Sequence, residues 1–329
     1  MSIPKNEIIC DDLNDAIDHY IDQLGYRLDM IVPADAPVAA VLSKDGESVR
    51  LEISSEFLVP NSKLRKESES IPGTSNSELG TRNLELETWI KGRAGMEYRD
   101  LIPDRLGGKM IASHIRLSKG GEVADYVHYH KVDFQMIYCK RGRIRVVYED
   151  QGPPFWLETG DCVLQPPEIR HRVLECTAGA EVIEIGMPAV HETWVEHDIS
   201  LPTSELKPDR HFRGQQFVRH IAADATWIPV ETAGCHVRET GISAATSGFA
   251  KVIVTRPLSS SLCPSESTQI HASELLFLFA LSGDVIIRTH VGDEYNLTTG
   301  DSCVIPPALD FRFEYSNDAE LLEVSLGKQ

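Results

Sequence analysis

Hydrophobic and polar positions alternate in short runs along most of the chain from residue 86 onward. Gly, Pro and Asp separate the runs at close spacing, as in "GRIRVVYEDQGPPFWLETGDCVLQPP" (142–167). Alternation with a period of two is typical of strands with one buried face, and frequent turns favour a sandwich or small barrel. No helical period of useful length accompanies these runs, so we predict a mainly β fold.

The β-rich part of the chain contains an internal repeat. Trp-Ile opens both 89–117 and 227–257, and each continues with Ala-Gly, an Arg beside an acid, and a Gly-led apolar strand. A Thr-Gly-Asp turn and a Pro-Pro pair recur in 142–173 and 283–313, at an offset of about 140 residues. We therefore predict two copies of one β unit.

The repeat also predicts the domain boundaries. The first copy spans 86–197 and the second 226–329, with a connection at 198–225. Residues 59–85 are polar and Ser-rich, which is typical of a linker. Residues 1–58 differ from both copies and are predicted to form a separate module.

The N-terminal module begins with a helix signal. The stretch "DDLNDAIDHYIDQLG" has an acidic cap, apolar residues at helical spacing and a closing Gly25. Strand-like runs lie on either side of the helix, and Asp45-Gly46 is a hairpin turn signal. The predicted order of elements is βαβββ.

Composition and charge narrow the classes of partner. The chain has 329 residues, is 42% hydrophobic and carries a formal net charge of −18. A folded globular protein is expected, and nucleic acid and anionic membrane surfaces are disfavoured because both attract basic surfaces.

The sequence also bears on location. It has no apolar run of membrane-spanning length, and its first residues lack the pattern of a signal peptide. The seven cysteines are odd in number and form no CxxC pair. We therefore expect free thiols and a cytoplasmic protein.

Three histidines are candidate metal ligands. One residue separates His128 from His130 in a strand-like stretch, so their side chains share a face. The next strand places Gln135 and Cys139 on one face, and His171 follows the Pro-Pro pair. Imidazole nitrogen suits iron, nickel, copper, zinc or manganese.

These spacings resemble the two motifs of the cupin superfamily, which are Gly, His-x-His, Glu and Gly, and then Gly, Pro, Gly and His. The first glycine is one residue further from the histidines than usual, Gln135 replaces the glutamate, and Glu168 replaces the last glycine. The resemblance implies two double-stranded β-helix barrels, with a metal inside the first. The matching residues are Gly121, His128, His130, Gln135, Gly142, Gly160, Pro166 and His171.

The second copy lacks the ligand set. Gln269, His271, Leu276 and Phe311 correspond to His128, His130, Gln135 and His171. The turns recur without the ligands, so packing of the barrel does not require the histidines. We predict one divalent metal per chain, with Fe(II) preferred and Mn, Ni, Zn or Cu as alternatives.

Gln135 has two interpretations. As a neutral ligand beside His128, His130 and His171, its amide oxygen would leave a divalent ion with its full charge, which favours an anionic or chelating substrate. Alternatively, Gln135 only hydrogen-bonds a bound water or ligand.

Two further residues are pocket candidates. The strand after Gly142 should turn Tyr148 toward the barrel interior, where its hydroxyl could approach the metal. Cys139 shares the predicted inner face with Gln135. Either side chain could instead be part of the core.

The N-terminal module resembles a single glyoxalase-type module of the vicinal-oxygen-chelate superfamily. Glu52 lies at that family's carboxylate position, whereas Lys5 falls where the other ligand is expected. Two modules are needed to close such a site, so we expect an interaction or pocket-covering role.

Three functions fit these features. The preferred hypothesis is a mononuclear Fe(II) dioxygenase that acts on a small oxygenated or anionic organic substrate chelated by the three-His centre. A metal-dependent isomerase, lyase or hydrolase would use the same site without O₂. A non-catalytic small-molecule-binding bicupin is the third, and the resemblance also implies self-association into a homodimer.

Overall fold

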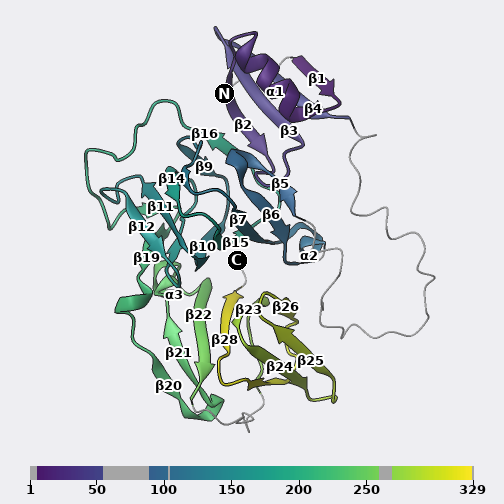
Figure 1. Ribbon diagram of the computed structural model, residues 1–329, viewed down its shortest axis with the longest axis vertical. Helices are drawn as coiled ribbons and strands as arrows, with labels where there is room; N and C mark the ends of the chain where they lie inside the picture. Colours follow the sequence, from purple (N-terminus) through teal and green to yellow (C-terminus); the bar gives the residue numbers. More distant parts are fainter. Residues whose placement is uncertain (1–5, 55–88, 103, 259–268, 328–329) are drawn as a thin grey trace, which may run out of the picture.

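The computed structural model describes residues 6–54, 89–102, 104–258 and 269–327. The predicted linker, 59–85, lies outside the described residues. Along the long axis of the molecule, the N-terminal module lies at one end, the first barrel in the middle and the second barrel at the other end (Figure 1). The fold is mainly β, as predicted.

The N-terminal module has the predicted βαβββ order. Asp12 caps the helix by accepting a hydrogen bond from the backbone N–H of Asp15, and the helix buries Leu13 and Ile17 against the sheet. The sheet order is β1-β4-β3-β2, and β2 continues into the first barrel through β16. The elements are β1 (Asn6–Cys10), α1 (Leu13–Asp22), β2 (Arg27–Val32), β3 (Ala39–Lys44) and β4 (Glu47–Ile53).

Two facing sheets form the first barrel. One sheet has the order β16-β9-β14-β11-β12, with β8 also paired to β14, and the other has the order β19-β13-β10-β15-β7-β6-β5. The first sheet contains β8 (Gly121–Glu122), β9 (His128–His130), β11 (Arg143–Tyr148), β12 (Phe155–Glu158), β14 (His171–Cys176) and β16 (Thr193–Val195). The second contains β5 (Ile90–Lys91), β6 (Glu97–Asp100), β7 (Ile111–Leu117), β10 (Phe134–Arg141), β13 (Cys162–Leu164), β15 (Ala180–Met187) and β19 (Val218–His220), with α2 (Arg105–Gly108) before β7.

The segment predicted as a connection, 198–225, folds against the first barrel. It contains a small hairpin, β17 (His211–Phe212) with β18 (Gln215–Gln216), and it supplies β19 as an edge strand beside β13. Phe217 lies between β18 and β19, and the centroid of its ring is 4.6 Å from that of Tyr148. The connection therefore adds to the wall of the first barrel.

The second barrel repeats the arrangement. Its sheets have the orders β20-β21-β22-β28-β23-β26 and β25-β24-β27. The bridge between Gln269 and Phe311 corresponds to the pair of His128 with His171 in the first barrel. Its elements are β20 (Ile228–Val230), β21 (Cys235–Glu239), α3 (Ile242–Ala245), β22 (Ala250–Pro257), β23 (Leu275–Ser282), β24 (Asp284–Thr289), β25 (Glu294–Thr298), β26 (Ser302–Ile305), β27 (Phe311–Tyr315) and β28 (Glu320–Leu326).

The two barrels pack through a shared apolar core. It joins buried residues of the first barrel, such as Phe134, to buried residues of the second, such as Phe277. Reciprocal arginine contacts flank this core. Arg99 donates to the carbonyl oxygen of Gly300 over 3.1 Å, and the guanidinium of Arg238 lies beside Gly160. Each arginine thus reaches the Thr-Gly-Asp turn of the opposite barrel.

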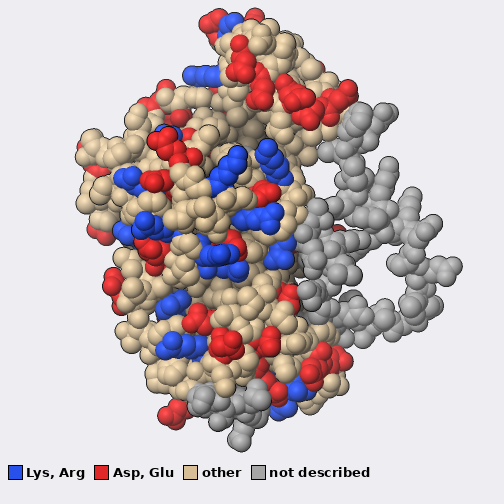
Figure 2. Space-filling view, in the orientation of Figure 1, with Lys and Arg blue, Asp and Glu red and all other residues tan. Residues whose placement is uncertain are grey.

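No helix in the described part of the chain is long and apolar enough to cross a membrane. On the face seen in Figure 2, basic and acidic side chains are interspersed over the first barrel.

The second barrel encloses a carboxyl group. Glu323 on β28 accepts a hydrogen bond from Thr255 over 2.8 Å, and the Tyr315 hydroxyl lies 3.3 Å from the same threonine oxygen. Burial raises the pKa of Glu323 from 4.5 to about 7, although the Thr255 hydrogen bond opposes the shift. Folding therefore favours the protonated form of this side chain.

We expect the stability of the protein to fall as Glu323 ionises. Because the folded-state pKa is raised, the protonated side chain contributes its full share to the free energy of unfolding below about pH 4.5. That share is lost as the pH rises through about 7. In the wild type the free energy of unfolding should fall by on the order of 3 kcal/mol between those limits, and Glu323→Gln should abolish this fall. Urea unfolding at several pH values measures this, with exposed Glu231→Gln as the control. Equal pH dependence in the wild type and Glu323→Gln would contradict the assignment.

Candidate metal centre

The three predicted histidines converge inside the first barrel. His128 and His130 project from the same face of β9, and antiparallel pairing places His171 of β14 directly opposite His128. All three are buried, with 0%, 5% and 6% of their surfaces exposed. One ligand atom from each lies within 4.8 Å of the others, and no other such group of His, Cys, Asp or Glu occurs among the described residues.

Hydrogen bonds orient each ring from its Nδ1 side. Nδ1 of His128 donates to the carbonyl oxygen of Tyr126 over 2.8 Å, and Nδ1 of His171 donates to that of Ile169 over 3.0 Å. Nδ1 of His130 lies 2.8 Å from the Thr193 hydroxyl. This arrangement leaves Nε2 as the nitrogen that would bind a metal, and it fits the neutral imidazoles that a divalent ion requires.

Two glutamine amides lie beside the histidines. Gln165 donates to Nε2 of His171 over 3.0 Å and to Oε1 of Gln135 over 3.3 Å. A metal bound to His171 would need the same lone pair, so Gln165 must release it when an ion binds. Gln135 donates in turn to Glu184 over 2.5 Å. Gln135 thus lies in the site, while its role as a direct ligand stays a prediction.

The Glu184 carboxylate changes the charge argument made for Gln135. Glu184 lines the same cavity as the histidines and accepts the Gln135 hydrogen bond. A carboxylate therefore belongs to the site, although it comes from β15 rather than from the glutamate position of the motif. With Glu184 ionised, the neighbourhood of a divalent ion would be less positive than Gln135 alone implies.

The two pocket candidates differ in position. Tyr148 is buried, its ring stacks on His171 with centroids 5.6 Å apart, and its hydroxyl donates to Gln165 over 3.1 Å. Burial raises its pKa well above the ordinary value, so the hydroxyl stays protonated. Cys139 is absent from the residues that line the cavity, and burial raises its pKa to about 12. Its thiol donates to the carbonyl oxygen of Gly142 over 3.5 Å, as expected for a core residue.

The cavity around the histidines is small and mostly apolar. Its volume is about 70 Å³, enough for a few waters or a very small organic molecule. Aliphatic and aromatic side chains form most of its wall, and hydrogen bonds link several of the polar lining residues to one another. The apolar part includes Met96, Tyr98, Ile115, Ile144, Val146 and Val182.

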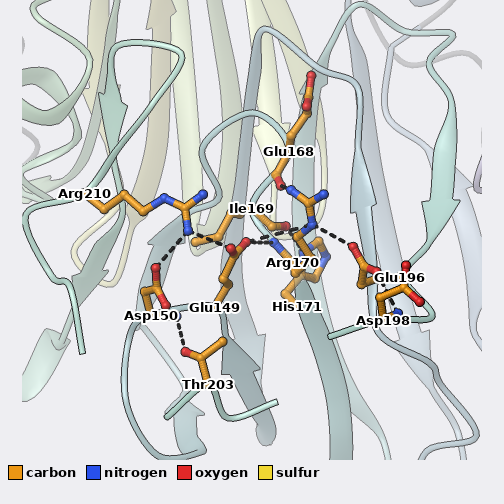
Figure 3. Close-up of polar contacts among 10 residues, drawn as sticks. All are labelled: Glu149, Asp150, Glu168, Ile169, Arg170, His171, Glu196, Asp198, Thr203 and Arg210. Atoms are coloured by element: carbon orange, nitrogen blue, oxygen red, sulfur yellow. Dashed lines mark hydrogen bonds and ion pairs between the residues drawn. The ribbon is translucent and has the colours of Figure 1, made fainter. Parts of the chain in front are cut away.

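Ion pairs outside the barrel hold the strands that carry the site (Figure 3). Arg170, next to His171, bonds Glu196 over 3.1 Å, and its backbone N–H donates to Glu149 over 3.3 Å. Arg210 of the connection bonds Glu149 over 2.6 Å and Asp150 over 2.8 Å. Burial opposes ionisation of Asp150, but hydrogen bonds with Arg210 and Thr203 hold its pKa below the ordinary value. The ends of β11, β14 and β16 are thereby tied together.

Several site residues were not predicted, although the sequence carried some signals. Gln165 is a polar residue directly after the apolar strand β13, and the second copy has Ile305 at the same position. Glu184 lies between Val182 and Gly186 on one face of β15, which an apolar strand would not require. Thr193 had no signal, because its place beside His130 depends on a strand pairing far along the chain.

Thr193→Val should weaken metal binding about 10- to 100-fold, because it removes the hydroxyl that orients His130 while keeping the side-chain shape. Competition with a chromophoric chelator measures the affinity. Thr240→Val, which removes a similarly buried hydroxyl in the second barrel, is the matched control. Equal affinities in the two variants would refute a role for Thr193.

Comparisons with known proteins agree with this architecture. The sequence of residues 113–186, which include His128, His130 and His171, matches the family profile described as a cupin domain. No curated protein matches the chain in sequence.

The fold is similar to solved structures of oxalate decarboxylase from Bacillus subtilis. A variant lacking two residues and a variant with an arginine replaced by alanine both give a TM-score of 0.57 at 14% identity. The enzyme at pH 4.6 gives 0.56 at 14% identity. These matches cover 78% of this chain and 78–79% of the others. At such identity the likeness shows the fold alone. The chain therefore has a two-barrel fold like that of oxalate decarboxylase, and its match to the cupin profile covers the strands that hold the three histidines.

Proposed function

We propose that the first barrel is the active site of a metal-dependent enzyme acting on a small oxygenated or anionic organic molecule. The observation that supports this most directly is the set of three imidazoles with ligand atoms within 4.8 Å of one another. Their enclosure in a cavity of about 70 Å³ limits the substrate to a small molecule.

A divalent ion would be held by His128, His130 and His171. Fe(II) is our preferred ion, and Mn, Ni, Zn or Cu would fit the same nitrogen ligands. When bound, the ion supplies a Lewis acid for substrate oxygens and, as Fe(II), a centre for reaction with O₂. We favour dioxygenation because the apolar wall suits O₂ and excludes water from the reacting groups.

The chain's own residues would position the substrate and accept its proton. Gln165 lines the cavity, and the N–H that it releases from His171 when an ion binds can be donated to a substrate oxygen. The Tyr148 hydroxyl holds this amide in place by donating to its Oε1. Glu184 can accept a proton from an enol or acid, with Gln135 fixing the orientation of its carboxylate. This carboxylate also favours the second candidate, a lyase, isomerase or hydrolase that needs no O₂.

Metal analysis and oxygen uptake test the proposal. The purified protein should contain one equivalent of divalent metal, and His128→Ala and His171→Ala should lose it. His211→Ala changes an exposed histidine of the connection and should keep the metal. Oxygen consumption by the Fe(II) protein with small oxo-acids or diketones would support dioxygenation, and turnover without it would support the second candidate. A wild type that binds no metal would end both.

Changing the charge beside the ion should change anion binding. Gln135→Glu places a second carboxylate against Glu184 and should weaken acetate binding to the Co(II)-loaded protein roughly tenfold. Glu184→Gln should strengthen it. Gln23→Glu, an exposed substitution of equal charge at the end of α1, is the control. Absorption titrations report the affinity, and tighter binding by Gln135→Glu would contradict the charge argument.

A further inference from the structure

The N-terminal module is joined to the metal centre by continuous strand pairing. Ile31 of β2 pairs with Thr193 of β16, and Thr193 pairs in turn with His130 of β9. The Thr193 hydroxyl also lies 2.8 Å from Nδ1 of His130. The module and the ligand strand therefore belong to one sheet, and the chain that leaves β2 starts close to the histidines.

The loop after β2 reaches the cavity itself. This loop, residues 33–38, connects β2 to β3. Ala34 is among the residues that line the cavity with His128, His130 and His171. No other lining residue comes from the described part of the N-terminal module, residues 6–54. Its methyl group therefore forms part of the wall around the candidate substrate site.

Buried contacts hold the loop against the first barrel. Asp35, 6% exposed, forms an ion pair with Arg105, and Arg105 also bonds both carboxylate oxygens of Asp100 over 3.0 and 3.1 Å. The loop backbone also packs closely on Gly92. A Cβ atom there would come within 2.7 Å of the Asp35 carbonyl oxygen and 2.6 Å of the Tyr98 ring, which itself lines the cavity.

We propose that the 33–38 loop is the wall that limits ligand size in the metal cavity. Ala34 sets the limit, and the ion pair of Asp35 with Arg105 holds the loop in place. In a cavity of about 70 Å³, the three extra carbons of a leucine at this position would exclude all but the smallest ligands. The N-terminal module would thus determine specificity, a role that rests on the proposed function of the first barrel.

The position of the loop can be tested in metal-free protein. Diethyl pyrocarbonate modifies accessible histidines, and peptide mass spectrometry resolves each site. Asp35→Asn should raise the modification rate of the buried cavity histidines several-fold, because the loop loses its ion pair. Exposed His211 and His290 serve as internal standards, and exposed Asp18→Asn in the same module is the control. Unchanged rates in Asp35→Asn would overturn the role of the ion pair.

The size limit is tested on Co(II)-loaded protein with formate, acetate and propionate. Ala34→Leu should weaken propionate binding at least tenfold more than formate binding and leave the metal content unchanged. Ala36→Leu lies in the same loop but does not line the cavity, so it should match the wild type. Equal affinities in both variants across the series would overturn the role of Ala34. Absence of metal from the wild type would instead count against the proposed function, and the histidine modification rates would still decide the position of the loop.

Discussion

The candidate site depends on the register of β9, β14 and β16. Antiparallel pairing puts His171 of β14 opposite His128 and Thr193 of β16 opposite His130. One strand beside β9 thus supplies the third ligand, and the other supplies the hydroxyl that orients His130. If the pairing register of one of these strands shifted by one residue, its side chains would point to the other face of the sheet, away from the site. The ion pairs of Arg170 and Arg210 at the strand ends oppose such a slip, because they fix where β11, β14 and β16 end.

The sequence predicted the features that depend on local pattern. Alternation and turn residues indicated β units, the recurrent Thr-Gly-Asp turn indicated duplication, and the His-x-His spacing indicated a shared face. The cupin fold that the motifs implied is the observed one. The three histidines do converge, and the βαβββ order of the first module is observed, whereas its likeness to glyoxalase modules stays a prediction.

Contacts between segments far apart in the sequence could not be predicted from local sequence patterns. Glu184 meets Gln135 because β15 pairs with β10, and Ala34 meets the cavity because β2 pairs with β16. Neither pairing has a local signal in the sequence. Cys139 illustrates the opposite error, because a residue on the correct face can lie too far along its strand to reach the site. The direction of a side chain follows from alternation, but its depth in a barrel follows from the tertiary fold.

The reciprocal contacts of Arg99 and Arg238 have a consequence for assembly. The arginine of each barrel contacts the Thr-Gly-Asp turn of the other barrel, as in the interface between two identical subunits related by a two-fold axis. Here this interface lies between two parts of one chain, so its surface is already buried. A dimer of two whole molecules must therefore form through a different face. The second barrel, which lacks the ligand set, still shields this face of the first barrel from solvent.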